Sequence, residues 1–155
     1  VRDQRAQRVV VADLDLVVPH QASGHALAFM RRRLRLRAEQ VVDIFAERGT
    51  PVLSATDGIV VRIGDFGIGG KHAWLMGPGG ERHYYAHLDD WAPGLHAWQR
   101  VRAGDAIGTV GNTGNARTTP PHLHYGIYDE AGALNPYPRL RDAKPAHLTE
   151  PPQPR

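Results

Sequence analysis

The sequence contains no cysteine, and its 155 residues hold no apolar run near the ~20 residues that a membrane-spanning helix needs. The first absence excludes disulfide bonds and thiolate metal sites, which leaves histidine, aspartate and glutamate as candidate metal ligands. The second predicts no membrane span, and no signal peptide is visible. Because the chain starts at Val1, a trimmed or processed N-terminus is expected. A net charge of only +3 weakly favours anionic surfaces as partners.

Length and composition predict one globular domain between two segments of different character. The content of hydrophobic residues, 41%, and of charged residues, 23%, is ordinary for a chain that buries a core. Residues 1–33 form a lead-in of mixed charge that includes three consecutive arginines, at positions 31–33. Residues 141–155 form a proline-rich tail that is expected to be extended or disordered. The domain itself is therefore expected over residues 34–140.

Arginine and leucine alternate over residues 33–37, which predicts a half-buried strand. A nucleic-acid-binding arm is the alternative explanation for these arginines. No interleaved aromatic residues and no recognisable binding motif accompany them, so a nucleic-acid partner is not expected.

Turn residues recur about every ten positions from Pro51 onward, with short β-branched runs such as residues 59–63 between them, and this spacing predicts an all-β domain. The turn signals are Asp57-Gly58, Gly64-Asp65, Gly69-Gly70, Gly79-Gly80, Gly94, Gly104-Asp105, Gly111 and Gly114. Residues 64–71 also suggest a phosphate-binding loop. That motif needs glycine where Asp65 stands and serine or threonine where His72 stands. A hairpin or loop between two strands is predicted there instead.

The motif His122-Leu123-His124 carries the clearest chemical signal. Residues two apart in a strand point to the same face, and the neighbouring Tyr125 and Ile127 favour a strand. Both imidazoles would then face one site, where they suit zinc binding and proton transfer. Taken alone, such a motif is more often a chance pair of surface histidines, so its context decides.

Seven motifs follow one another along the chain, and His-x-His ends the last of them. They are Val42–Ala46, Gly49–Val52, Ala55–Val60, Tyr84–Leu88, Val101–Gly108, Val110–Gly114 and Pro120–His124. This ordered set closely resembles the lysostaphin-type (LytM-like) zinc endopeptidases, which cleave peptide bonds in bacterial cell-wall peptidoglycan. The resemblance runs from about Leu34 to Tyr137. It implies an all-β fold, a small antiparallel β-sheet domain with an open groove, together with Zn²⁺ as cofactor and a periplasmic or extracellular location.

The resemblance also implies roles for four residues. Catalytic zinc typically keeps three protein ligands and a water molecule, whose pKa it lowers. Asp43 matches the family's ligand aspartate, and His124 matches a ligand histidine. His87 and His122 match the family's two remaining histidines, which implies that they act on the bound water or stabilise charge on the tetrahedral intermediate. The other histidines match no family ligand and are expected to be ordinary surface or partly buried residues: His20, His25, His72, His83, His96 and His147.

One ligand position departs from the family pattern. Four residues before Asp43, where the family carries its first zinc-binding histidine, this chain has Glu39. A fully extended step of four residues spans roughly 13 Å, so the backbone must bend, and Val41 bends less readily than the glycine often found there in the family. Glutamate can still bind zinc through oxygen. Two carboxylates and one imidazole would cancel the charge of the ion and weaken its effect on bound water.

Two functions of different classes follow. The first is a zinc-dependent endopeptidase of normal or reduced activity, with Asp43, His124 and Glu39 on the metal and stem or cross-bridge peptides of peptidoglycan as substrates. The second is a degenerate, non-catalytic member that binds cell wall or regulates another cell-wall hydrolase, and Glu39 supports it. The enzyme is favoured because four of the five expected site residues are intact. The oligomeric state stays open.

Two further predictions concern the groove. The turn at residues 112–115 directly precedes the His-x-His strand and is predicted to form a groove wall near His122. Five aromatic residues are candidates for either the core or the groove, and core packing is favoured for any single one. They are Trp74, Trp91, Trp98, Tyr84 and Tyr85.

Overall fold

The computed structural model describes residues 41–136 and Leu140. Glu39, the predicted strand at residues 33–37, the lead-in and the tail lie outside the described residues, so these predictions stay predictions. The elements of the described part are nine strands and two short 3₁₀ helices. They are β1 (Val41–Phe45), β2 (Pro51–Leu53), β3 (Gly58–Asp65), β4 (Lys71–Met76), η1 (Pro78–Gly80), β5 (Arg82–Trp91), β6 (Arg100–Val101), β7 (Ala106–Val110), η2 (Gly114–Ala116), β8 (His122–Asp129) and β9 (Gly132–Leu134).

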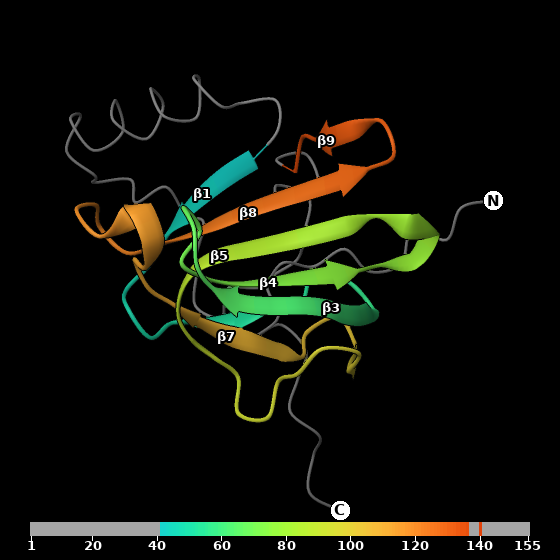
Figure 1. Cartoon of the computed structure of the whole chain (residues 1–155), viewed down its shortest axis with the longest axis horizontal. Coiled ribbons are helices and arrows are strands. Elements are labelled where there is room, and N and C mark those ends of the chain that lie inside the picture. Colours follow the sequence, from blue (N-terminus) through green and yellow to red (C-terminus); the bar gives the residue numbers. More distant parts are fainter. Residues whose placement is uncertain (1–40, 137–139, 141–155) are drawn as a thin grey trace, which may run out of the picture.

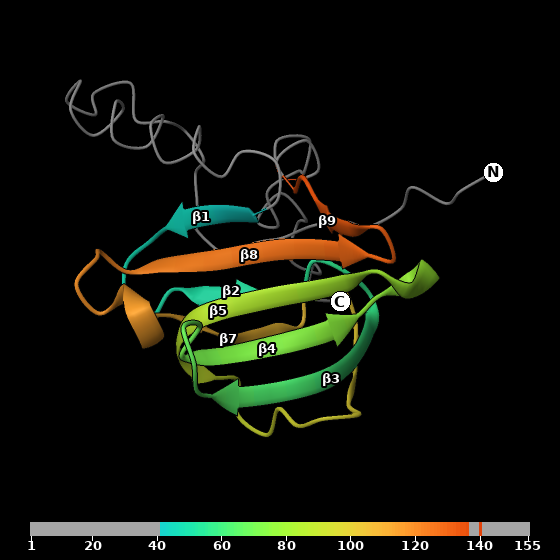
Figure 2. The same cartoon turned by 45° about the horizontal axis from the view of Figure 1, so that its top comes forward.

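The strands form one antiparallel sheet whose main path runs in the order β1-β8-β5-β4-β3-β6, and Figure 1 labels the first five of these strands. Strand β9 pairs with β8. Strand β2 pairs with β7, which in turn pairs with β5. Figure 2 shows β2 and β7 behind the middle of the main path. This arrangement confirms the predicted all-β, antiparallel fold. Across the described residues, the model contains no helix with the length and apolar character needed to cross a membrane.

The two faces of the main sheet differ because side chains alternate along each strand. In β8, Leu123, Tyr125 and Ile127 are at most 1% exposed, and they belong to the hydrophobic core. The β2–β7 ribbon adds apolar side chains to the same core, among them Val52, Ile107 and Val110. Burial of this apolar face stabilises the sheet, and it places the side chains of His122 and His124 on the opposite face of β8.

Tyr85 shows how a polar group is accommodated in this core. The side chain is fully buried, and its hydroxyl oxygen accepts a hydrogen bond from the backbone N–H of Ala55 at 2.9 Å. Burial raises the pKa of Tyr85 to about 12, because the charged phenolate would lose its hydration there. The hydroxyl therefore ties the segment after β2 to the centre of β5.

The hairpin predicted over residues 64–71 is confirmed, since β3 and β4 pair antiparallel on either side of it. The expectation of a turn at Gly64-Asp65 itself is wrong, because these are the last residues of β3. The turn lies one step later, where Gly67 and Gly70 adopt φ angles of 69° and 59°. Gly64 is needed for space, since a Cβ there would lie 2.4 Å from the Phe66 ring.

The five candidate aromatic residues divide among three environments. Tyr85 is core, and Trp91 packs at the edge of the core, where its indole N–H donates to the carbonyl of His72 at 3.1 Å. Trp74 and Tyr84 are half-buried on the sheet face opposite the core. Trp98 lies neither in the core nor on that sheet face, because it is 76% exposed in the loop between β5 and β6.

Candidate active site

Asp43 and His124 meet across the β1–β8 ladder. The two residues are direct partners in the antiparallel register, so their side chains stand side by side on one face. The Nδ1 atom of His124 lies 2.7 Å from the Oδ1 atom of Asp43. Their side chains are 14% and 17% exposed, which leaves the pair shielded but accessible. A carboxylate oxygen and an imidazole nitrogen therefore lie in direct contact, and their binding to one ion stays a prediction.

Two further histidines surround this pair. His122 lies two residues before His124 on the same face of β8, as the alternation predicted. His87 comes from the neighbouring strand β5, and its ring centroid lies 4.9 Å from that of His122 and 5.5 Å from that of His124. Of the five residues expected to act in the site, the four that the structure describes are thus brought together by β1, β8 and β5.

His87 is held in an unusual backbone conformation. Its φ angle is 61°, a left-handed value that costs a residue with a Cβ about 1–2 kcal/mol. Two hydrogen bonds hold it there: its backbone N–H donates to the carbonyl of Gly69 at 2.9 Å, and its ring Nδ1 contacts the carbonyl of Thr113 at 2.9 Å. Burial, with a smaller contribution from His122 and His124, lowers the pKa of His87 to about 4. The ring is therefore neutral at neutral pH.

Hydrogen bonds to carbonyl groups also set which ring nitrogen carries the proton. A carbonyl oxygen can only accept, so Nδ1 of His87 must be the donor toward Thr113. His122 Nδ1 makes the same kind of contact with the carbonyl of Pro120 at 2.9 Å. In the neutral form of both rings, Nε2 is therefore the unprotonated nitrogen, and it is the atom left to accept a proton from a reactant.

The donor set fits part of a zinc site. Zinc binds imidazole nitrogen and carboxylate oxygen at roughly 2.0–2.2 Å in a tetrahedron, which places two such donors about 3.3 Å apart. Asp43 and His124 would have to separate by only about 0.6 Å from their present contact to hold it. Within residues 41–136 and Leu140, no three histidine, aspartate or glutamate side chains form a group that could hold a metal ion. The third donor was predicted at Glu39, which lies outside this part.

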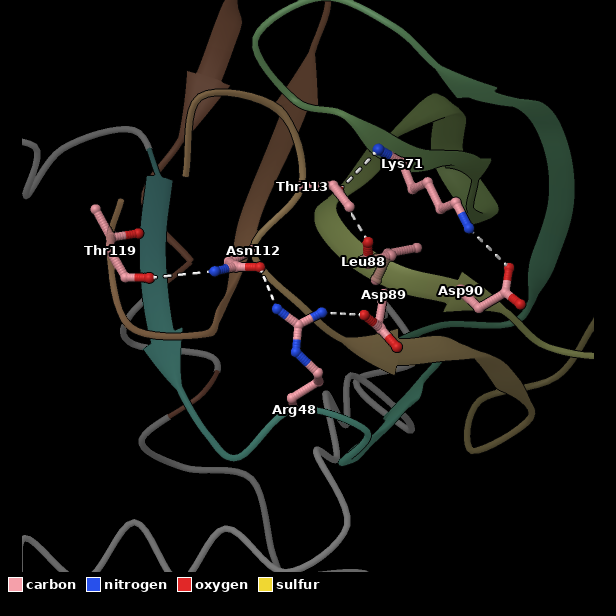
Figure 3. A network of polar contacts seen from close by, with 8 residues as sticks. All are labelled: Arg48, Lys71, Leu88, Asp89, Asp90, Asn112, Thr113 and Thr119. Atoms are coloured by element: carbon pink, nitrogen blue, oxygen red, sulfur yellow. Dashed lines mark hydrogen bonds and ion pairs between the residues drawn. The ribbon is translucent and has the colours of Figure 1, made fainter. Parts of the chain in front are cut away.

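Thr113 connects the segments that surround His87. Its hydroxyl donates to the carbonyl of Leu88 at 2.8 Å and accepts from the backbone N–H of Lys71 at 3.0 Å (Figure 3). Its own carbonyl accepts a hydrogen bond from Nδ1 of His87. The turn at residues 112–115 therefore lies beside His87 and close to His122, whereas its role as a groove wall stays a prediction. Sequence reasoning missed the individual role of Thr113, because a backbone carbonyl has no signature in the sequence.

A second set of polar contacts holds the same turn from outside. Arg48, in the β1–β2 connection, contacts both the carboxylate of Asp89 and the amide oxygen of Asn112 (Figure 3). Gly114 is required for close approach, because a Cβ there would lie 2.3 Å from the carbonyl oxygen of Ile68. The turn is thus fixed between the β1–β2 connection and the tip of the β3–β4 hairpin.

Two of the remaining histidines differ from expectation. His72 and His83 are 4% and 1% exposed, so they are buried rather than surface or partly buried. Each is accommodated by a hydrogen bond at 2.8 Å, His72 with the carbonyl of Gly70 and His83 with the hydroxyl of Tyr125. His96 is exposed, as expected. His20, His25 and His147 lie outside the described residues.

The fold defines the class of the protein: a lysostaphin-like β domain, the fold of a metallopeptidase family. The chain belongs to peptidase family M23, which its residues 37–136 match. Among curated proteins, it is 38% identical over 127 residues to an L-Ala–D-Glu endopeptidase of Bacillus subtilis. It is 34% identical over 108 residues to the glycyl-glycine endopeptidase ALE-1 of Staphylococcus capitis.

These matches cover most of this chain but a minor part of the relatives. The match to the Bacillus protein covers 76% of this chain and 38% of that protein, and the match to ALE-1 covers 66% and 29%. The chain therefore spans well under half the length of these relatives.

Solved structures give the same fold. The catalytic domain of lysostaphin from Staphylococcus simulans aligns with a TM-score of 0.58 at 32% identity, over 64% of this chain and 77% of that chain. A zinc-containing peptidase from Vibrio cholerae aligns with a TM-score of 0.51 at 29% identity, over 56% of this chain and 26% of that chain. Both likenesses confirm the lysostaphin-like fold expected from the motifs.

Proposed function

We propose that this chain is a zinc-dependent endopeptidase that hydrolyses peptide bonds in bacterial cell-wall peptidoglycan. The observation that carries the proposal is the convergence of Asp43 Oδ1 and His124 Nδ1 at 2.7 Å beside the rings of His87 and His122. Membership of a peptidase family supports it, as do relatives named for cutting L-Ala–D-Glu and glycyl-glycine bonds. The location that suits this substrate is the periplasm or the outside of the cell.

Asp43 and His124 would hold the zinc ion, with Glu39 as the third ligand. Bound zinc supplies a water molecule of lowered pKa and a positive charge that polarises the scissile carbonyl. His87 and His122 would accept and donate protons during the reaction. Each presents an unprotonated Nε2 in its neutral form, because its Nδ1 is engaged by a carbonyl. One of them takes a proton from the attacking water, and a protonated ring returns a proton to the leaving amine.

The environment of His87 fixes the protonation state and the orientation of its ring. A pKa of about 4 keeps its ring neutral and able to accept a proton at neutral pH. The hydrogen bond that Nδ1 of His87 donates to the carbonyl of Thr113 keeps the ring oriented.

The test is digestion of purified peptidoglycan with the purified protein, with and without a chelator, followed by analysis of the products. We expect new peptide amino groups to appear, chelation to stop their release and added zinc to restore it. Absence of product with zinc-loaded protein would refute the proposal.

A degenerate, non-catalytic member that binds cell wall or regulates another hydrolase is the second candidate. Glu39 favours it, since a site with two carboxylates and one imidazole cancels the charge on zinc. Metal content separates the two functions. One zinc ion per chain supports the enzyme, whereas no zinc after supplementation supports the binding protein.

A further inference from the structure

The sheet face that carries the site continues away from it as a set of aromatic side chains. Tyr84 contacts His124 edge-on, with ring centroids 6.2 Å apart. Trp74 stacks on Tyr84 at 4.3 Å and contacts Tyr128 at 5.4 Å. Phe66 contacts the ring of the buried His72, which in turn contacts Tyr84. We call Phe66, Trp74, Tyr84 and Tyr128 the aromatic strip.

The aromatic strip lies on the face of the sheet opposite the core. Trp74 and Tyr84 are register partners on β4 and β5, and the residues that follow them, Leu75 and Tyr85, are fully buried on the core side. The members of the strip keep contact with solvent: Phe66 is 53% exposed and the other three are half-buried. Aromatic faces in such positions offer apolar contact area to a ligand.

Two glycines let these rings approach the sheet backbone. A Cβ at Gly126, the register partner of Tyr84, would lie 2.9 Å from the ring of Tyr128. A Cβ at Gly64 would lie 2.4 Å from the ring of Phe66. The rings therefore occupy space that side chains would fill at these positions. The rings lie close to the sheet backbone, and through Tyr84 they continue up to His124.

Two arginines border the strip. Arg62 is the register partner of Trp74, and its guanidinium carbon lies 4.7 Å from the ring centroid of Phe66. Arg82 is the register partner of Tyr128. Both arginines are exposed, and among the described residues neither has an ion-pair partner.

The arginine charges also act on the tyrosines of the strip. Burial raises the pKa of Tyr84 and that of Tyr128, and the charge of Arg62 opposes the first shift while that of Arg82 opposes the second. Each guanidinium is therefore close enough to the strip to act on a ligand bound there.

We propose that the aromatic strip, with Arg62 and Arg82, binds an acidic peptide beside the scissile bond and selects it over a peptide made only of glycine. The inference rests on the proposed function, because it takes peptidoglycan as the source of the peptide. A glycine-only bridge has no side chain to pack on aromatic rings and no carboxylate to pair with arginine. A stem peptide that contains glutamate offers both, and a carboxylate–guanidinium pair is a strong directional contact.

Strand geometry sets where the carboxylate must be. Tyr128, beside Arg82, lies four residues along β8 from His124, a step of about 13 Å in a strand. An extended peptide covers the same span in about four residues. Because the arginine side chain is long and can reach toward the ligand, fewer residues are needed between the cleaved bond and the carboxylate. The acidic residue therefore lies within about three residues of the cleaved bond.

Binding of short peptides tests this proposal without any need for cleavage. The probes are L-Ala–γ-D-Glu–L-Lys with a free glutamate α-carboxylate, the same tripeptide with that carboxylate amidated, and triglycine, all with amidated C-termini. Tryptophan fluorescence reports contact with Trp74. We expect the acidic tripeptide to change the emission of the wild type, the Trp74→Phe variant to lose this change, and the Trp98→Phe variant to keep it.

The arginines are tested by charge-matched pairs of variants. We expect Arg62→Gln/Arg82→Gln to bind the acidic tripeptide about 3- to 10-fold more weakly, a range expected for two partly exposed charge pairs, and to bind the amidated tripeptide as the wild type does. Arg100→Gln/Arg102→Gln removes the same charge from exposed positions at and beside β6 and should leave both affinities unchanged.

Three results would overturn the inference: equal wild-type affinity for the acidic and the amidated tripeptide, equal weakening in both double variants, or an unchanged fluorescence response in Trp74→Phe. Peptidoglycan digestion decides the proposed function separately. Selective binding without digestion would leave the inference standing and remove the enzyme, whereas digestion without charge selectivity would do the reverse.

Discussion

Replacing Thr113 by valine isolates one hydroxyl group that holds the surroundings of His87. Valine keeps the shape of threonine but loses the donor to the carbonyl of Leu88 and the acceptor for the N–H of Lys71, which lie at 2.8 and 3.0 Å. Each hydrogen bond contributes about 1 kcal/mol net, and more where a partner stays unsatisfied. The loss of both should therefore cost about 2 kcal/mol, which lowers the melting temperature on the order of 8 °C.

The same change should reduce catalysis, because the carbonyl of Thr113 orients His87. Loosening the turn displaces that carbonyl without removing it, and small displacements of catalytic groups cost roughly 10-fold or more in rate. The assay is thermal unfolding together with kcat and KM on peptidoglycan fragments. The Thr113→Ser variant is the matched control, since it keeps the hydroxyl and should retain most of both properties.

Two results would refute this reasoning. If the valine variant unfolds at the wild-type temperature and cleaves at the wild-type rate, the two hydrogen bonds do not hold the turn. If the serine variant is as damaged as the valine variant, the methyl group of Thr113 matters and the hydroxyl does not.

Three further predictions concern the metal, the anomalous ligand and the core. His122→Ala should lower turnover by about 10²–10⁴-fold with zinc still bound, whereas His124→Ala should also lose the metal; equal zinc content in the two variants would contradict these separate roles. Glu39→His should raise the net charge of the site and increase peptidoglycan cleavage, and Glu39→Ala should weaken zinc binding; unchanged zinc affinity in both would show that Glu39 is not a ligand. Burial raises the pKa of Tyr85 from about 10 when unfolded to about 12 when folded, so its contribution to stability is present below pH 10 and falls by about 2 kcal/mol as the pH rises to 12. Tyr85→Phe should remove this part of the alkaline destabilisation, measured by urea unfolding at pH 9 and pH 11.5, with Tyr128→Phe as the half-buried control.

Local pattern was sufficient for some of the site. A strand has a side-chain period of two, so a single strand prediction placed His122 and His124 on one face, and β8 bears this out. The hairpin at residues 64–71 was also predictable from local sequence, because this glycine-rich segment lacks the residues that a phosphate-binding loop needs. The burial of His72 and His83 was not predictable, since it depends on carbonyl and hydroxyl partners contributed by residues at other positions.

The sequence by itself determined the all-β class and the family, and it predicted the chemical identity of the site: one aspartate and three histidines carried by recognisable motifs, with Glu39 as a further ligand. Only the tertiary structure decided that Asp43 and His124 meet at 2.7 Å, that His87 turns toward them with a left-handed backbone, and that an aromatic surface continues from the site. The reason is physical. These contacts depend on how β1, β8, β5 and β4 align, and that register is set by burial of their common apolar face, a property that no single segment contains.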